Sequence, residues 1–194
     1  MRKFALLGLT LIFATTLLAQ ESQTKPSTDE SKPTMRDVKP EVPAVPAAKP
    51  ADVKDIDSIL AALYDVISGP PGPRDWDRFN SLFIPEAHLI FTGKKPDGTP
   101  VHRALTPAEY QEHSGAYFLK EGFFENSLSN KIDRFGQVAQ VFSTYESRKE
   151  KGAKPFARGI NSIQLMNDGT RWWVVSILWD SERPDNPIPK KYLK

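Results

Sequence analysis

Four long segments with the character of β-strands fill the second half of the chain, and they constrain the fold more than any other feature. They are rich in β-branched and aromatic residues and are separated by turn signals. The turn NDGT, residues 167–170, is a strong hairpin signal. Because the helical patterns all come earlier in the chain, this order predicts an α+β fold with a long antiparallel sheet. The four segments span residues 123–132, 138–147, 156–166 and 172–179.

A long helical pattern precedes the strands. It starts at Asp52, a residue type that caps helices, and stops at Gly69-Pro70-Pro71. Its apolar residues follow the three- and four-residue spacing of one helix face, which predicts an amphipathic helix that covers one face of the sheet. These residues are Ile56, Ile59, Leu60, Leu63 and Ile67.

Two shorter helices are also predicted. One fits Arg74–Phe83 and is closed by Pro85, after which residues 87–91 predict a strand. The other opens with the sequence TPAE, residues 106–109, which is a capping box with proline at the first helical position. This helix is expected to run to about Lys120.

The N-terminus predicts export. Arg2 and Lys3 precede an almost uninterrupted apolar run, residues 4–18, and Ala19 is a small residue before a cut ahead of Gln20. The alternative is a membrane anchor, but the run is shorter than the ~20 apolar residues that a spanning helix needs. Residues 1–19 are therefore interpreted as a signal peptide, and we expect a periplasmic or secreted protein with no stable membrane anchor after cleavage.

Composition narrows the partners and the chemistry. The chain has no cysteine, which excludes thiol nucleophiles, iron–sulfur clusters and cysteine-based zinc sites. We expect no metal and no cofactor. The formal net charge is +2, and two positive charges leave with the signal peptide, so no basic excess remains for nucleic acid.

Proline-rich segments flank the predicted domain. Residues 20–51 contain little apolar bulk and predict a disordered linker. The domain then spans residues 52–183, and residues 184–194 form an extended tail. This tail could fold over the rim of the sheet or dock on a partner.

The last predicted strand is apolar on both faces. An antiparallel sheet with one solvated face should alternate apolar and polar residues, so both faces of this strand are expected to be covered. Helices cover one face, and we expect a second copy of the chain to cover the other, in a homodimer through the outer sheet face. The alternative is that long loops or the C-terminal tail cover it. One face carries Trp172, Val174, Ser176 and Leu178, and the other carries Trp173, Val175, Ile177 and Trp179.

The order of these elements, ending in the strand GTRWWVVSILW, resembles the nuclear transport factor 2-like superfamily, which includes SnoaL-like and ketosteroid isomerase-like proteins. The resemblance covers about residues 52–182 and also rests on DIDSILAALYDVISG and DWDRFNSLF. It implies a cone-shaped, curved antiparallel sheet wrapped around N-terminal helices, with an open end that admits a small ligand. Such proteins often dimerise, and they range from isomerases, dehydratases and cyclases to non-catalytic binders, so the fold does not settle the function.

The residue set of ketosteroid isomerase-type chemistry is incomplete in this chain. That chemistry uses a carboxylate base, with a tyrosine and a protonated aspartic acid that bind an enolate oxygen. Tyr64 is a match for the tyrosine, but the first strand carries His88 and no aspartate. The strand FARGINSIQLM carries Arg158 and Asn161 and no second acid. The resemblance therefore leaves open dehydratase-like chemistry with histidine and tyrosine.

Histidines are the first further candidates. His88 and His113 can move protons near neutral pH, and His113 lies near Tyr110 on the predicted third helix. A structural role is the alternative for both. Trp76 and other aromatic residues could wall a ligand pocket, or could belong to the core and a dimer contact.

The strand VFSTYESR supplies two more candidates. Tyr145 and Glu146 point to opposite faces of this strand, so only one of them lines the cavity. Tyr145 would act there as a hydrogen-bond donor, and Glu146 as a buried acid with an unusual titration. The alternative is a polar ladder across the strands, such as Glu146 with Arg158.

Three functions follow from these candidates. The first is an exported small-molecule-binding protein, with Tyr64, Trp76, Tyr110, His113, Arg158 and Asn161 as ligand-binding candidates. The second is a lyase or isomerase that acts on a small ring or carbonyl compound, with His88 or Glu146 moving a proton and Tyr64 or Tyr145 donating to oxygen. The third is a dimeric, non-catalytic interaction module whose cavity is filled by its own side chains.

Overall fold

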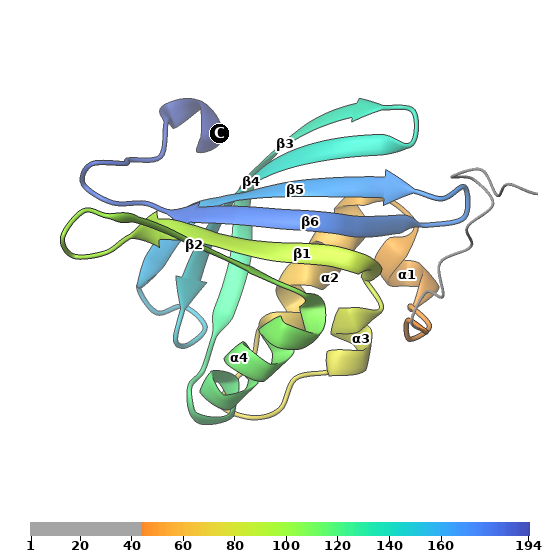
Figure 1. Ribbon diagram of the computed structural model, residues 1–194, viewed down its shortest axis with the longest axis horizontal. Coiled ribbons are helices and arrows are strands. Elements are labelled where there is room, and N and C mark those ends of the chain that lie inside the picture. Colours follow the sequence, from red (N-terminus) through yellow and green to blue (C-terminus); the bar gives the residue numbers. More distant parts are fainter. Residues whose placement is uncertain (1–43) are drawn as a thin grey trace, which may run out of the picture. The chain divides into compact units, whose positions relative to one another are not determined.

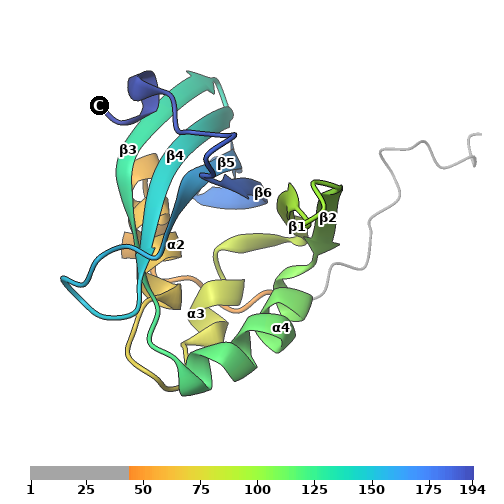
Figure 2. The ribbon, with the colours of Figure 1, turned by 90° about the vertical axis from the view of Figure 1, so that its left-hand side faces the viewer.

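The computed structural model describes residues 44–194. The predicted signal peptide and the predicted linker as far as residue 43 lie outside the described residues. The described part forms a six-stranded sheet with helices on one side of it (Figures 1 and 2). None of its helices is long and apolar enough to cross a membrane.

The sheet has the strand order β2-β1-β6-β5-β4-β3. All neighbouring strands are antiparallel except β1 and β6, which are parallel. The predicted α+β class with a curved, largely antiparallel sheet is confirmed (Figure 2). The strands are β1 (Phe83–Lys94), β2 (Pro100–Leu105), β3 (Phe124–Phe135), β4 (Val138–Arg148), β5 (Ala157–Asn167) and β6 (Trp172–Ser181). The helices are α1 (Pro50–Val53), α2 (Ile56–Ile67), α3 (Trp76–Asn80), α4 (Pro107–Lys120) and the 3-10 turn η1 (Lys190–Tyr192).

Helix α2 is the predicted amphipathic helix, but its cap differs from the prediction. Asp55 caps it, because the Asp55 carboxylate accepts a hydrogen bond of 2.7 Å from the backbone N–H of Ser58. Asp52 lies instead in α1, where its carboxylate pairs with Arg78 at 2.7 Å. The apolar face of α2 is buried against the sheet and forms the centre of the core with Phe79.

Helix α3 is shorter than the predicted Arg74–Phe83. Asp75 caps it by accepting from the backbone N–H of Arg78, and β1 already begins at Phe83. Pro85 therefore lies inside β1 and does not close the helix. The pairing of β1 with β6 is interrupted between Phe83 and His88, so proline, which has no N–H, fits there without breaking a ladder hydrogen bond.

Helix α4 begins as the sequence predicts. The Thr106 hydroxyl accepts from the backbone N–H of Glu109, and the Glu109 carboxylate accepts from the backbone N–H of Thr106. This reciprocal capping box fixes the start of α4 directly after β2. The helix then runs beside β1 and β2, at the opposite edge of the sheet from β3 (Figure 1).

A β-bulge in β6 changes which residues face the helices. Leu165 of β5 pairs with Val174 and Gln164 pairs with Ser176, so Val175 has no partner in the register. The inner face, which we define as the face toward α2, therefore carries Val174 before the bulge and Ile177 after it. The regular alternation assumed from the sequence is wrong beyond Val174, and the outer face receives Ser176 and Leu178 instead of a second apolar row.

The bulge removes the premise from which the homodimer was predicted, and the C-terminal tail covers part of the outer face. The Tyr192 ring lies 5.5 Å from the Phe142 ring, centroid to centroid. The Thr144 hydroxyl donates to the Tyr192 carbonyl oxygen at 2.6 Å, and Ile188 is buried. The tail therefore occupies a surface for which a second copy of the chain was expected. The homodimer itself stays a prediction.

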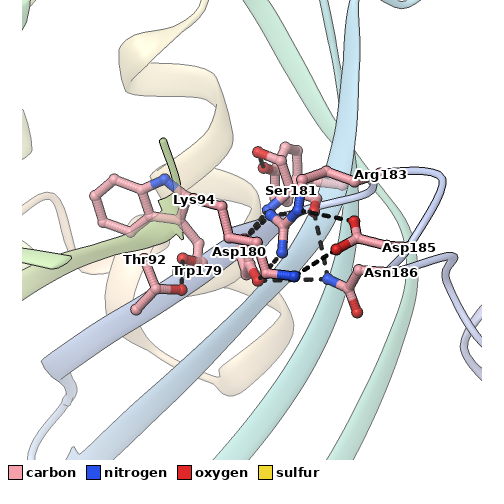
Figure 3. Close-up of polar contacts among 9 residues, drawn as sticks. Thr92, Lys94, Trp179, Asp180, Ser181, Arg183, Asp185 and Asn186 are labelled. Atoms are coloured by element: carbon pink, nitrogen blue, oxygen red, sulfur yellow. Dashed lines mark hydrogen bonds and ion pairs between the residues drawn. The ribbon is translucent and has the colours of Figure 1, made fainter. Parts of the chain in front are cut away.

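An ion-pair network holds the start of the tail against the end of β6 (Figure 3). Arg183 donates to both carboxylate oxygens of Asp180, and Lys94 of β1 pairs with Asp185. The Thr92 hydroxyl donates to the carbonyl oxygen of Trp179 at 2.9 Å. These contacts fix the end of β6, where Trp179 lines the pocket described next.

Candidate functional site

A pocket of about 230 Å³ lies between the inner face of the sheet and the helices. We call it the inner pocket. Most of its wall is apolar or aromatic, and its polar groups come from three adjacent strands, β3, β4 and β5, and from α2 and α4. The apolar wall consists of Leu63, Ile67, Phe79, Leu89, Phe123, Phe156, Ala157, Ile163, Ile177 and Trp179.

Glu125 of β3 is the acidic residue of this wall. It pairs in register with Ser147 of β4, and the Ser147 hydroxyl donates to the Glu125 carboxylate at 2.7 Å. The Glu125 backbone N–H donates to the Ser68 hydroxyl at 2.9 Å, so the end of α2 holds this point of β3 in place. Burial raises the pKa of Glu125 to about 7, although hydrogen bonds from Ser147 and Asn161 act in the opposite direction.

Tyr145 of β4 places a hydroxyl group in the same pocket. Its ring lies against Gly159 of β5, where an added Cβ would come within 2.5 Å of the Tyr145 hydroxyl oxygen. Its only hydrogen bond in the described part is a long one, of 3.2 Å, to the Ser181 hydroxyl. Burial raises the pKa of Tyr145 to about 12, and the charge of Glu125 adds to this effect. Tyr145 is therefore a neutral donor that a ligand oxygen can recruit.

Tyr64 of α2 lies in the pocket wall, but its hydroxyl proton is already engaged in a hydrogen bond within the protein. The Ser143 hydroxyl donates to Asn130 Oδ1 at 2.6 Å, so the Tyr64 hydroxyl is the donor in its 2.5 Å contact with Ser143. Asn161 Nδ2 in turn donates to the Tyr64 oxygen at 3.1 Å. This chain of hydrogen bonds ties α2 to three strands, and burial raises the pKa of Tyr64 above its ordinary value. Tyr64 is thus a structural tie in the wall, and it has no free proton to donate to a ligand.

Three residues predicted from the sequence lie away from the inner pocket. Glu146 faces outward and pairs with Arg148 at 2.5 Å. Arg158 is the register partner of Glu146, but it pairs with Glu182 at 2.8 Å, so the suggested ladder of Glu146 with Arg158 does not form. His88 is exposed on β1. The structure brings none of these three side chains to the pocket.

The remaining predicted residues lie around helix α4. Tyr110 lines the inner pocket, and its ring stacks on Phe79 with centroids 5.3 Å apart. Burial raises the pKa of Tyr110 above its ordinary value. Trp76 packs between α3 and α4, where its ring stacks on Phe118 at 6.2 Å. His113 is exposed and lines a neighbouring hollow.

Glu125 is the site residue that the sequence reasoning missed. The sequence does contain a signal for it. Phe123, Glu125 and Ser127 stand at every second position at the start of a strand, beside the aromatic pair Phe123-Phe124, so their side chains share one face of that strand. Its use requires the register with β4, which places Glu125 beside Ser147 and Ser127 beside Tyr145. In the described part, no group of three or more histidine, aspartate or glutamate side chains is arranged to hold a metal ion.

Comparisons with known proteins show the fold. No family model matches the sequence, and no curated protein matches it. A Nostoc punctiforme protein of unknown function, described as having a cystatin-like fold, superposes with a TM-score of 0.52 at 10% identity, over 68% of this chain and 91% of that one. A Mycobacterium tuberculosis protein of unknown function gives a TM-score of 0.50 at 14% identity, over 68% and 73%.

A nuclear transport factor 2-like protein of unknown function from Shewanella baltica also matches, with a TM-score of 0.42 at 14% identity, over 66% of this chain and 91% of that one. These likenesses carry no ligand or activity to this chain, because structural similarity at such low identity reports the fold alone. The chain therefore shares its α+β fold, a curved six-stranded sheet with helices on one side, with the Nostoc punctiforme and Mycobacterium tuberculosis structures, and its place in the nuclear transport factor 2-like superfamily stays a prediction.

Proposed function

We propose that this chain is an exported protein that binds a small, largely apolar molecule in the inner pocket. The observation that carries the proposal is the Glu125 carboxyl group, held by the Ser147 hydroxyl in a wall that is otherwise mostly aromatic and aliphatic; burial there raises its pKa to about 7. A folded protein keeps a desolvated carboxyl group in an apolar cavity at a cost in stability, so such groups concentrate at functional sites. Export rests on the signal peptide predicted at residues 1–19.

The size of the pocket limits the ligand. An apolar cavity of about 150 Å³ holds a benzene molecule, and the inner pocket measures about 230 Å³. The part of the ligand that enters is therefore one substituted ring or two small fused rings. A carbonyl or hydroxyl oxygen on that ring system would accept from the Tyr145 hydroxyl and would lie near Glu125.

A second candidate function is a lyase or isomerase that acts on such a ring compound. Glu125 supports it, because a group whose pKa lies near the working pH both takes and returns a proton efficiently. In this mechanism Glu125 removes a proton next to a carbonyl group, and Tyr145 donates a hydrogen bond to the oxygen on which negative charge develops. Glu125 takes the place that the sequence reasoning gave to His88 or Glu146, and Tyr145 keeps its role as donor.

A thermal-shift screen tests the binding function. The chain from Gln20 onward is heated with a panel of one- and two-ring ketones, phenols and alcohols. A ligand at a hundredfold excess over its dissociation constant stabilises the native state by ~2.7 kcal/mol, which is a clear rise in melting temperature. Ala157→Trp places a large ring in the wall of the inner pocket and should abolish the shift. Phe135→Ala, at a largely exposed position on β3, should leave it unchanged.

The outcomes separate the two functions. A shift that Ala157→Trp abolishes supports binding in the inner pocket. Turnover of the bound compound, lost in Glu125→Gln and reduced in Tyr145→Phe, supports the enzyme. If no ring compound of this panel shifts the melting temperature, or if Ala157→Trp leaves the shift intact, the binding proposal is wrong.

A further inference from the structure

A second hollow adjoins the inner pocket. We call it the outer hollow, although it lies on the inner face of the sheet, between α4 and the β1–β2 edge. Its volume is about 540 Å³. Tyr110, Phe123 and Trp179 belong to the walls of both spaces. Three aromatic side chains therefore form the boundary between the two spaces.

The wall of the outer hollow contains one formally charged side chain, and it is a cation. This wall contains the guanidinium group of Arg103 on β2 and the imidazole of His113 on α4, and it contains no carboxylate. Arg103 makes no hydrogen bond and no ion pair within 4.0 Å to any residue of the described part. The charges of Glu109 and Arg103 attract each other without an ion pair within 4.0 Å, and the Glu109 carboxylate is held at the start of α4, where it accepts from the backbone N–H of Thr106 at 2.7 Å and from the Thr106 hydroxyl at 3.0 Å.

The two spaces differ in the polar groups that they offer. At the end toward β3 and β4 are Glu125 and Tyr145, which suit a neutral oxygen on the ligand. At the end toward β2 are Arg103 and His113, which suit an anion, because a guanidinium group binds a carboxylate through paired N–H donors. Arg103 is exposed on β2, so water and salt screen part of this attraction.

We propose that the ligand is an elongated amphipathic anion, an aromatic or alicyclic carboxylate. Its ring system lies in the inner pocket, and its carboxylate lies in the outer hollow against Arg103 and His113. This inference rests on the proposed binding function and adds the chemical class of the ligand to it. Arg103 and His113 determine specificity in this arrangement, and they take no part in proton transfer at Glu125.

Two fluorescent probes of matched shape test the proposal. 8-Anilinonaphthalene-1-sulfonate carries the anilinonaphthalene rings with an anionic group, and N-phenyl-1-naphthylamine carries the same rings without it. Each probe is titrated into the chain from Gln20 onward and into Arg103→Gln, His113→Gln and the double variant. Lys120→Gln is the matched control, because it removes one positive charge from the exposed end of α4 outside both walls. Near-ultraviolet circular dichroism checks that every variant is folded.

The expected result is a selective loss. Arg103→Gln should weaken binding of the sulfonate about three- to tenfold, and the double variant more, while the neutral probe keeps its affinity within about twofold. Raising the salt concentration from 0.05 M to 0.5 M should weaken the sulfonate in the wild type and much less in the double variant. Lys120→Gln should change neither probe.

Failure of this inference and failure of the proposed function look different. In one outcome both probes bind and Ala157→Trp weakens both, so the inner pocket binds ligands. If Arg103→Gln and the double variant then bind the sulfonate as tightly as the wild type does, the anion site is refuted. An equal loss of both probes in Arg103→Gln refutes it as well. If neither probe binds the folded wild type, or if Ala157→Trp leaves both affinities unchanged, the proposed function itself fails.

Discussion

Replacing Glu125 by glutamine should remove a pH dependence from the stability of the folded chain. Burial raises the pKa of this carboxyl group from its ordinary value of 4.5 to about 7, so the folded state binds the proton more tightly than the unfolded state does. The stabilisation that this proton provides is complete below pH 4.5 and is lost as the pH rises through 7. Glutamine stays neutral throughout and shows no such loss.

The magnitude follows from the two pKa values. One pKa unit corresponds to ~1.36 kcal/mol, so the difference between 4.5 and 7 gives an upper value of about 3 kcal/mol. The Glu125 residue is only partly buried, which allows water to relieve some of this cost. We expect the free energy of unfolding of the wild type to fall by about 2 to 3 kcal/mol relative to Glu125→Gln between pH 4.5 and pH 8.

Urea unfolding at pH 4.5, 6, 7 and 8, followed by tryptophan fluorescence, measures this difference. The matched control is Glu86→Gln, which changes an exposed carboxyl group on β1 outside the pocket and should run parallel to the wild type at every pH. A gap between wild type and Glu125→Gln that stays constant within about 0.5 kcal/mol over this range would refute the reasoning. It would mean that water reaches the carboxyl group freely in the folded state.

Three further predictions concern the frame around the site. Tyr64→Phe should lower the free energy of unfolding by about 1 to 3 kcal/mol, because Ser143 and Asn161 lose a buried partner; chemical unfolding measures it, and a loss below 0.5 kcal/mol would show that water replaces the hydroxyl. Gly159→Ala should lower the free energy of unfolding by about 1 to 3 kcal/mol and displace the Tyr145 ring, because the new Cβ would collide with the Asp180 carbonyl oxygen and lie 2.7 Å from Tyr145 Cε1; unchanged stability and unchanged tyrosine absorbance would contradict this packing. Deletion of residues 184–194 should uncover Phe142 and promote self-association through the outer face, as seen by sedimentation velocity; a truncated chain that stays monomeric at high concentration would show that this surface needs no cover.

The sequence predicted the order and type of the elements because strong local signals mark them. The capping box at Thr106 and Glu109, the apolar spacing of α2 and the turn NDGT all depend on residues close together in the chain. The boundaries that failed involve contacts between distant segments. Asp52 is a residue type that caps helices, but its carboxylate pairs with Arg78. Pro85 lies in the part of β1 where the pairing with β6 is interrupted.

The candidate site was less predictable, because it depends on the register of strands that lie far apart in the chain. Tyr145, Tyr110, Tyr64 and Asn161 were named from the sequence and line the inner pocket. Glu125 was missed, because nothing local shows that it pairs with Ser147 and shares a face with Tyr145. The charge of Arg103 gained meaning only when α4 was seen to lie beside β2.

The unpaired Val175 has a practical consequence for protein engineering. A scheme that changes every second residue from Trp172 would reach Ser176 and Leu178 and leave the pocket untouched, whereas Ile177 and Trp179 are the positions that widen or narrow it. Strand β6 also carries one residue more than a regular ladder requires. Removing Val175 would leave the other residues of the strand on their own faces, so a deletion, usually a drastic edit in a central strand, is here among the milder ones.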